Sequence, residues 1–163
     1  MEAKRWLIDD AESSVTFVAT SSVHPIRTIG AASGWLEATL DDAGFARGAD
    51  LRGLLEVPVA GLSSGNPLVD REIRRRVDTT THPVIVAEID STEGGGGDIA
   101  TITGTIQFLG VETLVEGDLN LVAGPRLIGV GEFDVGWWGL DPPKLLMLRV
   151  EPIVTVEIDL PLV

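Results

Sequence analysis

The chain has 163 residues, 44% of them hydrophobic, with 25 acidic and 12 basic side chains for a formal net charge of −13. This length predicts one domain, residues 1–163, with a substantial core, and the acidity argues against a nucleic-acid partner, since phosphate backbones are bound by clustered Lys and Arg. The sequence contains no cysteine, which excludes disulfides and thiolate chemistry.

Alternation of apolar and polar residues with a period of two dominates the chain and is typical of strands with one buried face. In chain order the clearest runs cover residues 14–19, 35–40, 51–59, 99–108 and 150–160. Turn signals separate the runs, and we predict a flexible hairpin loop at the glycine-rich segment Glu93–Asp98. The pattern predicts an all-β fold, an antiparallel up-and-down β-barrel of about eight strands, with a two-sheet sandwich as the alternative.

One short helix is predicted from Leu68 to Val77. Asn66 is suited to cap the free N–H groups of the first turn, and Pro67 fits the first helical position. From Val69 onward, apolar residues recur every four positions, which places them on one face. A helix of about three turns does not persist alone in water, so we expect this face to dock on the barrel.

Candidate catalytic residues begin with Ser63, which lies in a G-x-S-x-G sequence between a strand and a helix. A nucleophilic serine there requires a base within hydrogen-bond reach and a parallel sheet with several crossover helices. His82 is the one histidine downstream, and neither it nor His24 has carboxylates spaced for a metal site. We therefore predict a turn rather than a nucleophile, and a protein without catalytic residues, metal or cofactor. A serine hydrolase acting through Ser63 is the less favoured alternative.

The one basic cluster of this acidic chain consists of Arg71, Arg74, Arg75 and Arg76, within the predicted helix. A solvated helix face is the simpler interpretation. The functional alternative is an anchor for a phosphate or carboxylate, because a guanidinium group matches both in geometry. In that case Arg74 and Arg75 would contact the head group of a ligand.

Two adjacent indoles, Trp137 and Trp138, lie between glycines near the end of the chain. Neighbouring residues of a strand face opposite ways. At most one of these two side chains is therefore expected in the interior.

The N-terminus has basic residues at Lys4 and Arg5, but Asp9, Asp10 and Glu12 follow at once and leave no apolar stretch of a secretion signal. No window is long and apolar enough for a transmembrane segment. The negative charge also disfavours attraction to an anionic membrane surface. The sequence as given predicts a cytoplasmic location.

Several segments, in the right order, resemble the YceI-like family. They are Trp6–Asp9 with Ser13–Phe17, Ser64–Asp70, His82–Ile85, Gly104–Ile106 with Gly110–Thr113, and Val154–Leu160. The resemblance implies a lipocalin-like barrel with a helix covering one end. It also implies a long apolar interior that carries a polyisoprenoid, a quinone or a fatty-acid-like lipid, with no enzymatic step.

On this reading the ligand is lined by the more apolar face of each strand. The candidates are Phe17, Leu36, Leu55, Val57, Ile102, Ile106, Val154 and Val156. Inward glycines such as Gly53 and Gly104 would widen the bore. A barrel filled by its own side chains, acting as a structural or protein-interaction module, stays open as an alternative, as does a homodimer.

Overall fold

The computed structural model describes residues 3–42, 44–46, 50–140, 144–145 and 148–163, without the side chains of 90–96, 144, 145 and 148. Within these residues, eleven antiparallel strands form one sheet: ten follow the order β1-β4-β7-β8-β9-β10-β11-β13-β2-β3, and β12 pairs with β13 beside this path. Their bounds are β1 Lys4–Leu7, β2 Ser14–Ser21, β3 Ile26–Gly30, β4 Ser33–Ala38, β7 Arg52–Pro58, β8 Val84–Gly96, β9 Ile99–Phe108, β10 Val111–Val122, β11 Arg126–Asp134 and β13 Leu148–Pro161. The short strands β5 Leu40–Asp41, β6 Gly44–Phe45 and β12 Lys144–Leu145 complete the set.

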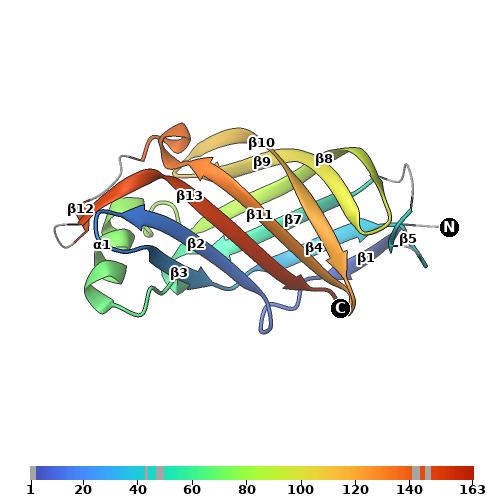
Figure 1. Cartoon of the computed structure of the whole chain (residues 1–163), viewed down its shortest axis with the longest axis horizontal. Helices are drawn as coiled ribbons and strands as arrows, with labels where there is room; N and C mark the ends of the chain where they lie inside the picture. Colours follow the sequence, from blue (N-terminus) through green and yellow to red (C-terminus); the bar gives the residue numbers. More distant parts are fainter. Residues whose placement is uncertain (1–2, 43, 47–49, 141–143, 146–147) are drawn as a thin grey trace.

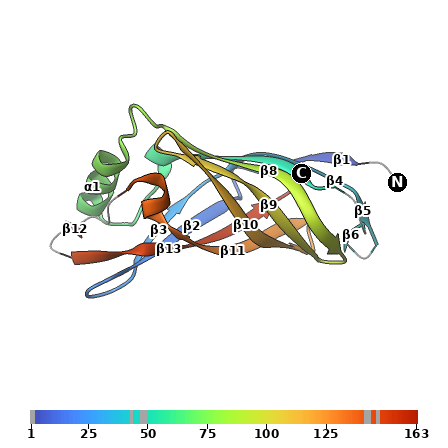
Figure 2. The same cartoon turned by 90° about the horizontal axis from the view of Figure 1, so that it is seen from above.

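The sheet curls into an open, half-closed barrel (Figures 1 and 2), which confirms the predicted all-β, lipocalin-like class. At one end the first strand meets the last, where Leu7 N–H bonds Val163 O at 2.9 Å and Val163 N–H bonds Leu7 O at 2.8 Å. On the other edge, Ile29 and Ser63 exchange two backbone bonds of 2.9 Å. These few hydrogen bonds attach the two edge strands to neighbouring segments, but no continuous ladder joins the edges to each other.

The predicted count of about eight strands was low, because two short strands lack a clear alternating run. β1 has three exposed side chains out of four, so it carries almost no buried face. β3 has five residues, which is short for a periodic pattern to stand out. Both strands lie at the edges of the sheet.

The helix α1, Pro67–Val77, agrees with the prediction. The Asn66 side chain accepts bonds from Leu68 N–H at 3.0 Å and Val69 N–H at 3.4 Å, and these satisfy donors that the first turn leaves free. Asp78 ends the helix in a left-handed conformation. Val69 and Val77 are buried, so the apolar face docks at the end of the barrel that Figure 1 shows beside β12.

The glycine-rich segment is not a flexible loop of six residues, as predicted, but mostly strand. β8 continues to Gly96, and the turn to β9 occupies Gly97 and Asp98. Gly94, Gly95 and Gly96 pair with β9 beyond two irregularities in the register. Ladder hydrogen bonds use backbone groups alone, so a glycine run can extend a hairpin although it carries no alternation.

Buried apolar side chains gather at the end of the interior opposite α1, which we call the packed end. There Ile8, Leu36, Ala38, Phe45 and Leu162 belong to one buried cluster. Figure 1 shows this end, with β1, β4, β5 and both termini, far from the helix.

Candidate functional site

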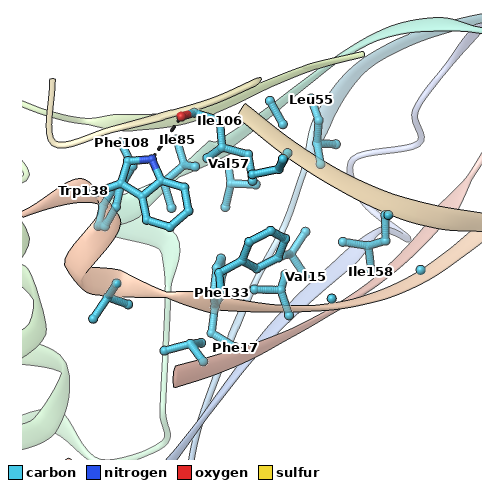
Figure 3. Close-up of a pocket in the computed structure, with 18 of the residues that line it drawn as sticks. Val15, Phe17, Leu55, Val57, Ile85, Ile106, Phe108, Phe133, Trp138 and Ile158 are labelled. Atoms are coloured by element: carbon cyan, nitrogen blue, oxygen red, sulfur yellow. Dashed lines mark hydrogen bonds between the residues drawn. The ribbon is translucent and has the colours of Figure 1, made fainter. Parts of the chain in front are cut away.

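An apolar cavity of about 350 Å³ occupies the interior toward the helix end. The inner faces of β2, β3, β7, β8, β9, β10, β11 and β13 line it, together with α1 and the 3₁₀ turn η2, Val135–Trp138. Figure 3 shows aliphatic and aromatic side chains converging on this space from opposite walls. Such a volume lies in the range of about 300–1,000 Å³ that is usual for small-molecule sites.

The cavity is long in one direction. Along β13 its lining residues run from Val150 to Ile158, which at about 3.3 Å per residue corresponds to roughly 26 Å. A site of that shape fits a chain better than a compact molecule.

Seven of the eight predicted lining residues border the cavity. They are Phe17, Leu55, Val57, Ile102, Ile106, Val154 and Val156. Leu36 does not, although it faces inward: it is 2% exposed and belongs to the packed core. Of the two predicted inward glycines, Gly104 lines the cavity and Gly53 does not, since a Cβ on Gly53 would already lie 3.2 Å from Leu36 Cδ1.

An aromatic group that the sequence analysis missed borders the cavity near the helix end. The rings of Phe108 and Phe133 meet Trp138 edge-on at centroid distances of 6.5 and 6.2 Å. Phe108 continues the alternation of Ile102 and Ile106 along β9, so the pattern contained a signal for it. No such signal existed for Trp138, because it lies in a 3₁₀ turn.

The expectation for the tryptophan pair is confirmed. Trp138 is 5% exposed and Trp137 is 54% exposed, so one indole enters and one stays outside. The strand argument behind the expectation was wrong, since η2 is a helical turn. Side-chain alternation could not have told which of the two is buried.

The electrostatics of the site are one-sided. Within the described part of the chain, the charged residues along the cavity boundary are all acidic: Glu88, Glu116, Asp118 and Glu151. These belong to the polar faces of their strands, so the interior itself offers a ligand almost no polar partner.

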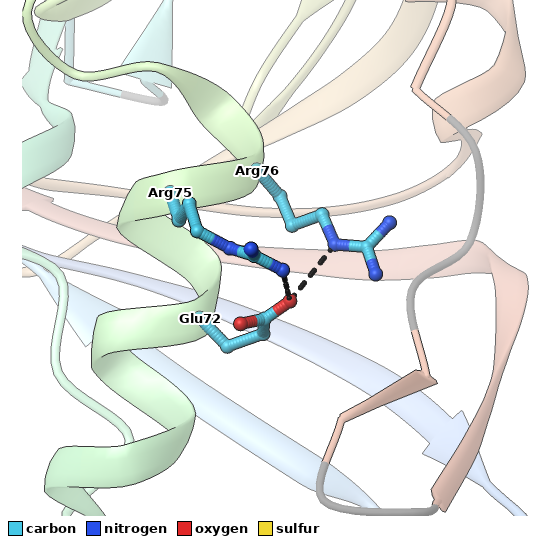
Figure 4. A network of polar contacts seen from close by, with 3 residues as sticks. All are labelled: Glu72, Arg75 and Arg76. Atoms are coloured by element: carbon cyan, nitrogen blue, oxygen red, sulfur yellow. Dashed lines mark hydrogen bonds and ion pairs between the residues drawn. The ribbon is translucent and has the colours of Figure 1, made fainter.

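The arginine cluster lies on α1 outside the cavity. Glu72 Oε1 bonds Arg75 Nη2 at 2.7 Å and Arg76 Nε at 3.0 Å (Figure 4). These two hydrogen bonds hold the pKa of Glu72 below its usual value. Neither Arg74 nor Arg75 lines the cavity, so a head-group role for them stays a prediction.

Ser63 belongs to a loop organised by a buried carboxylate. Asp70 is 8% exposed and accepts bonds from Ser64 N–H at 2.7 Å, Ser64 Oγ at 2.5 Å and Ser63 Oγ at 3.4 Å. Burial raises the pKa of Asp70, but these hydrogen bonds and the charge of Arg74 outweigh it and lower the pKa. His82 lies beside Gly110 in the β9–β10 turn. The G-x-S-x-G residues therefore shape the turn before α1.

None of the helices in the described residues combines the length and apolarity needed to cross a bilayer.

A family model described as a YceI-like domain matches residues 6–162. No curated protein matches the chain. The match thus spans nearly the whole sequence, including every strand of the sheet from the second half of β1 onward.

Solved structures share the fold at low sequence identity. BcnA of Burkholderia cenocepacia superposes with a TM-score of 0.77 at 16% identity, covering 94% of this chain and 98% of its own. A polyisoprenoid binding domain from Saccharophagus degradans gives 0.73 at 16% identity, with 95% of each chain covered. The YCEI protein of Campylobacter jejuni gives 0.60 at 13% identity, covering 78% and 79%.

Proposed function

The chain belongs to the YceI-like domain family, and on this premise we propose that it binds and carries a long apolar ligand without a catalytic step. The ligand class is a polyisoprenoid, a quinone or a fatty-acid-like lipid. The observation that carries the proposal is the elongated apolar cavity at the helix end of the barrel.

The energetics favour a chain-like ligand. Each CH₂ group moved from water into the cavity contributes about 0.8 kcal/mol. Burial of about ten such groups contributes roughly 8 kcal/mol before the entropic cost of association. Because the walls offer few polar partners, the affinity grows with the length of the apolar chain rather than with specific hydrogen bonds.

The relatives support the same class of ligand. One of the similar structures is described as a polyisoprenoid binding domain. At 16% identity the likeness supports the fold, and the apolar lining of this chain supplies the argument for the ligand.

The filled-barrel alternative fits the packed end around Leu36, whereas the helix end contains the cavity. A cytoplasmic location and a homodimer stay predictions.

The absence of catalysis is part of the proposal. Ser63 Oγ has the carboxylate of Asp70 as its partner, and that carboxylate is already held by Ser64. A serine nucleophile needs a base that is free to take its proton.

Native mass spectrometry and organic extraction of the purified protein test the proposal directly. We expect a co-purifying lipid adduct, and we expect a fluorescent long-chain fatty acid to bind to the stripped protein. The substitution Val156→Trp, on the lining face of β13, should weaken binding at least tenfold. Thr155→Trp, on the opposite face of the same strand, is the matched control. Absence of both an adduct and probe binding would overturn the proposal.

A further inference from the structure

The two strands β10 and β11 pair along less than half of their length. Their ladder joins Leu119–Val122 to Arg126–Gly129 and then ends. Beyond that point β10 is bonded to β9 through Val111 and β11 to β13 through Asp134. Residues 111–118 of β10 and 130–134 of β11 are therefore not paired with each other in a ladder.

The cavity reaches this unpaired stretch. On the β10 side it is bordered by Val115, Glu116, Gly117 and Asp118, and on the β11 side by residues 129–131 and 133. Of these, Glu116, Asp118 and Val130 lie on the outer faces of their strands and are exposed. These residues lie where the β10–β11 ladder has ended, so the cavity borders a stretch of wall that no ladder hydrogen bonds close. We call this stretch the β10–β11 slit.

Small residues widen the slit from inside. Gly117 and Gly131 lie on its two margins, and both border the cavity. A Cβ placed on Gly117 would meet no atom within 4 Å. Apolar side chains also stand exposed outside it, with Leu114 80% and Val130 63% exposed.

The helix end is more thoroughly covered than the slit. Ile73 and Val77 of α1 border the cavity from that end. Trp138 in η2 bonds the Ile106 carbonyl at 3.0 Å, as Figure 3 shows. A ligand leaving endwise would have to displace packed elements, whereas the slit needs two unbonded strand segments to part.

We propose that the ligand enters and leaves sideways, through the β10–β11 slit. This inference rests on the proposed function and adds the route of exchange. A ligand chain that enters sideways does not have to thread end-first through a cavity roughly 26 Å long. Its polar head stays at the slit, in contact with water.

The absence of cysteine from the chain makes a cross-linking experiment clean. Continuing the register Leu119 to Gly129 places Glu116 opposite Glu132 and Asp118 opposite Val130. The double substitution Glu116→Cys/Glu132→Cys, linked by a short bis-maleimide, closes the slit. Asp118→Cys/Val130→Cys closes it one step from the existing ladder and serves as the milder second variant.

The matched control is Asn120→Cys/Ile128→Cys, on the same two strands where they are already paired. The measurement is stopped-flow exchange of a fluorescent long-chain fatty acid, before and after linking, with unfolding curves to verify the fold. Linking at the slit should slow both association and dissociation at least tenfold and leave the equilibrium affinity within threefold. Linking the control pair should change neither rate.

The outcomes separate the two proposals. Unchanged exchange rates in both linked slit variants, with probe binding intact, would overturn the lateral route and leave the carrier function standing. Failure of the unlinked and native proteins to bind any long-chain probe would overturn the carrier function, and the route with it.

Discussion

The indole Nε1–H of Trp138 donates a hydrogen bond to the backbone carbonyl of Ile106, 3.0 Å away. This bond joins η2, which follows β11, to β9 on the other side of the cavity. Since β10 lies between β9 and β11 in the sheet order, the bond spans the region where the β10–β11 ladder is missing. Trp138 thus fastens the two walls together at the helix end.

Trp138→Phe should therefore loosen both the fold and the site. It removes the bond to Ile106 and part of the buried ring, and we expect a loss of about 1–3 kcal/mol in the free energy of unfolding. Ligand dissociation should also become faster. Trp137→Phe is the control, because that ring is 54% exposed and should change stability by about 0.5 kcal/mol or less. Urea unfolding and stopped-flow dissociation measure both effects, and equal behaviour of the two variants would contradict the assignment.

Local patterns predicted the local features well. Period-two alternation identified the inner faces of β9 and β13 and therefore most of the cavity lining, and Asn66 with Pro67 located the start of α1. These features depend on neighbours in the chain. Even the Asp of the segment Ser64–Asp70 has a local role, since Asp70 holds the Ser64 turn.

Features that depend on how strands assemble could not be predicted in this way. Alternation shows that Leu36 and Ile106 both face inward, but not that the interior is filled at one and hollow at the other. The β10–β11 slit is likewise invisible, because where the pairing of two strands ends is not encoded in the pattern of either strand alone. Such differences arise from the twist and spacing of the whole sheet.

Asp70→Asn should make the protein less stable in a pH-dependent way. The lowered pKa of Asp70 means that its ionised form stabilises the fold above about pH 4, the usual value in an unfolded chain. That contribution is lost as the pH falls through the lower pKa of the folded state. We expect the variant to lose about 1–3 kcal/mol at pH 7, from hydrogen bonds to a charged group.

The measurement is urea unfolding of both proteins at pH 7 and at successively lower pH. The gap between them should narrow as the pH falls below about 4, because the carboxyl of the unfolded chain is protonated there while that of the folded protein is still ionised. A gap that stays constant over this range would show that the charge of Asp70 is irrelevant.

Leu36→Ala and Ile106→Ala should separate stability from binding. Leu36 is 2% exposed in the packed end, so its truncation leaves a new cavity and should cost about 2–5 kcal/mol. Ile106 already borders empty space, so its truncation should cost less stability but weaken probe binding. Thermal unfolding and probe titration provide the two measurements. A loss of affinity confined to Leu36→Ala would place the ligand at the packed end and contradict the proposed site.

Acidic residues at the slit should make the site discriminate against an anionic head group. Glu116 and Asp118 border the cavity there, and each exposed like charge costs about 1 kcal/mol or less at low salt. A long-chain alcohol should thus bind on the order of tenfold more tightly than the phosphate of the same chain. Glu116→Gln/Asp118→Asn and added salt should both reduce the difference. Tighter binding of the phosphate that is lost in Arg74→Gln would instead place the head group at α1.

Gly117→Trp should obstruct the cavity without disturbing the fold. Gly117 lies on the inner face of β10 at the slit, and a Cβ there would meet nothing within 4 Å. The indole would extend into the space that the ligand occupies, so we expect at least a tenfold loss of affinity for a fluorescent long-chain fatty acid. Stability should change by about 1 kcal/mol or less, because a glycine within a strand is itself unfavourable.

The matched control for this substitution is Gly61→Trp. Gly61 also has no atom within 4 Å of an added Cβ, but it is exposed, at the end of the turn η1, Val59–Gly61, and does not border the cavity. Both variants introduce the same side chain at a glycine with open space around it, so any difference in binding reports the location alone. If Gly117→Trp binds the probe as tightly as Gly61→Trp does, while circular dichroism shows both folded, the ligand does not occupy the slit region. The binding site would then have to lie elsewhere on the molecule.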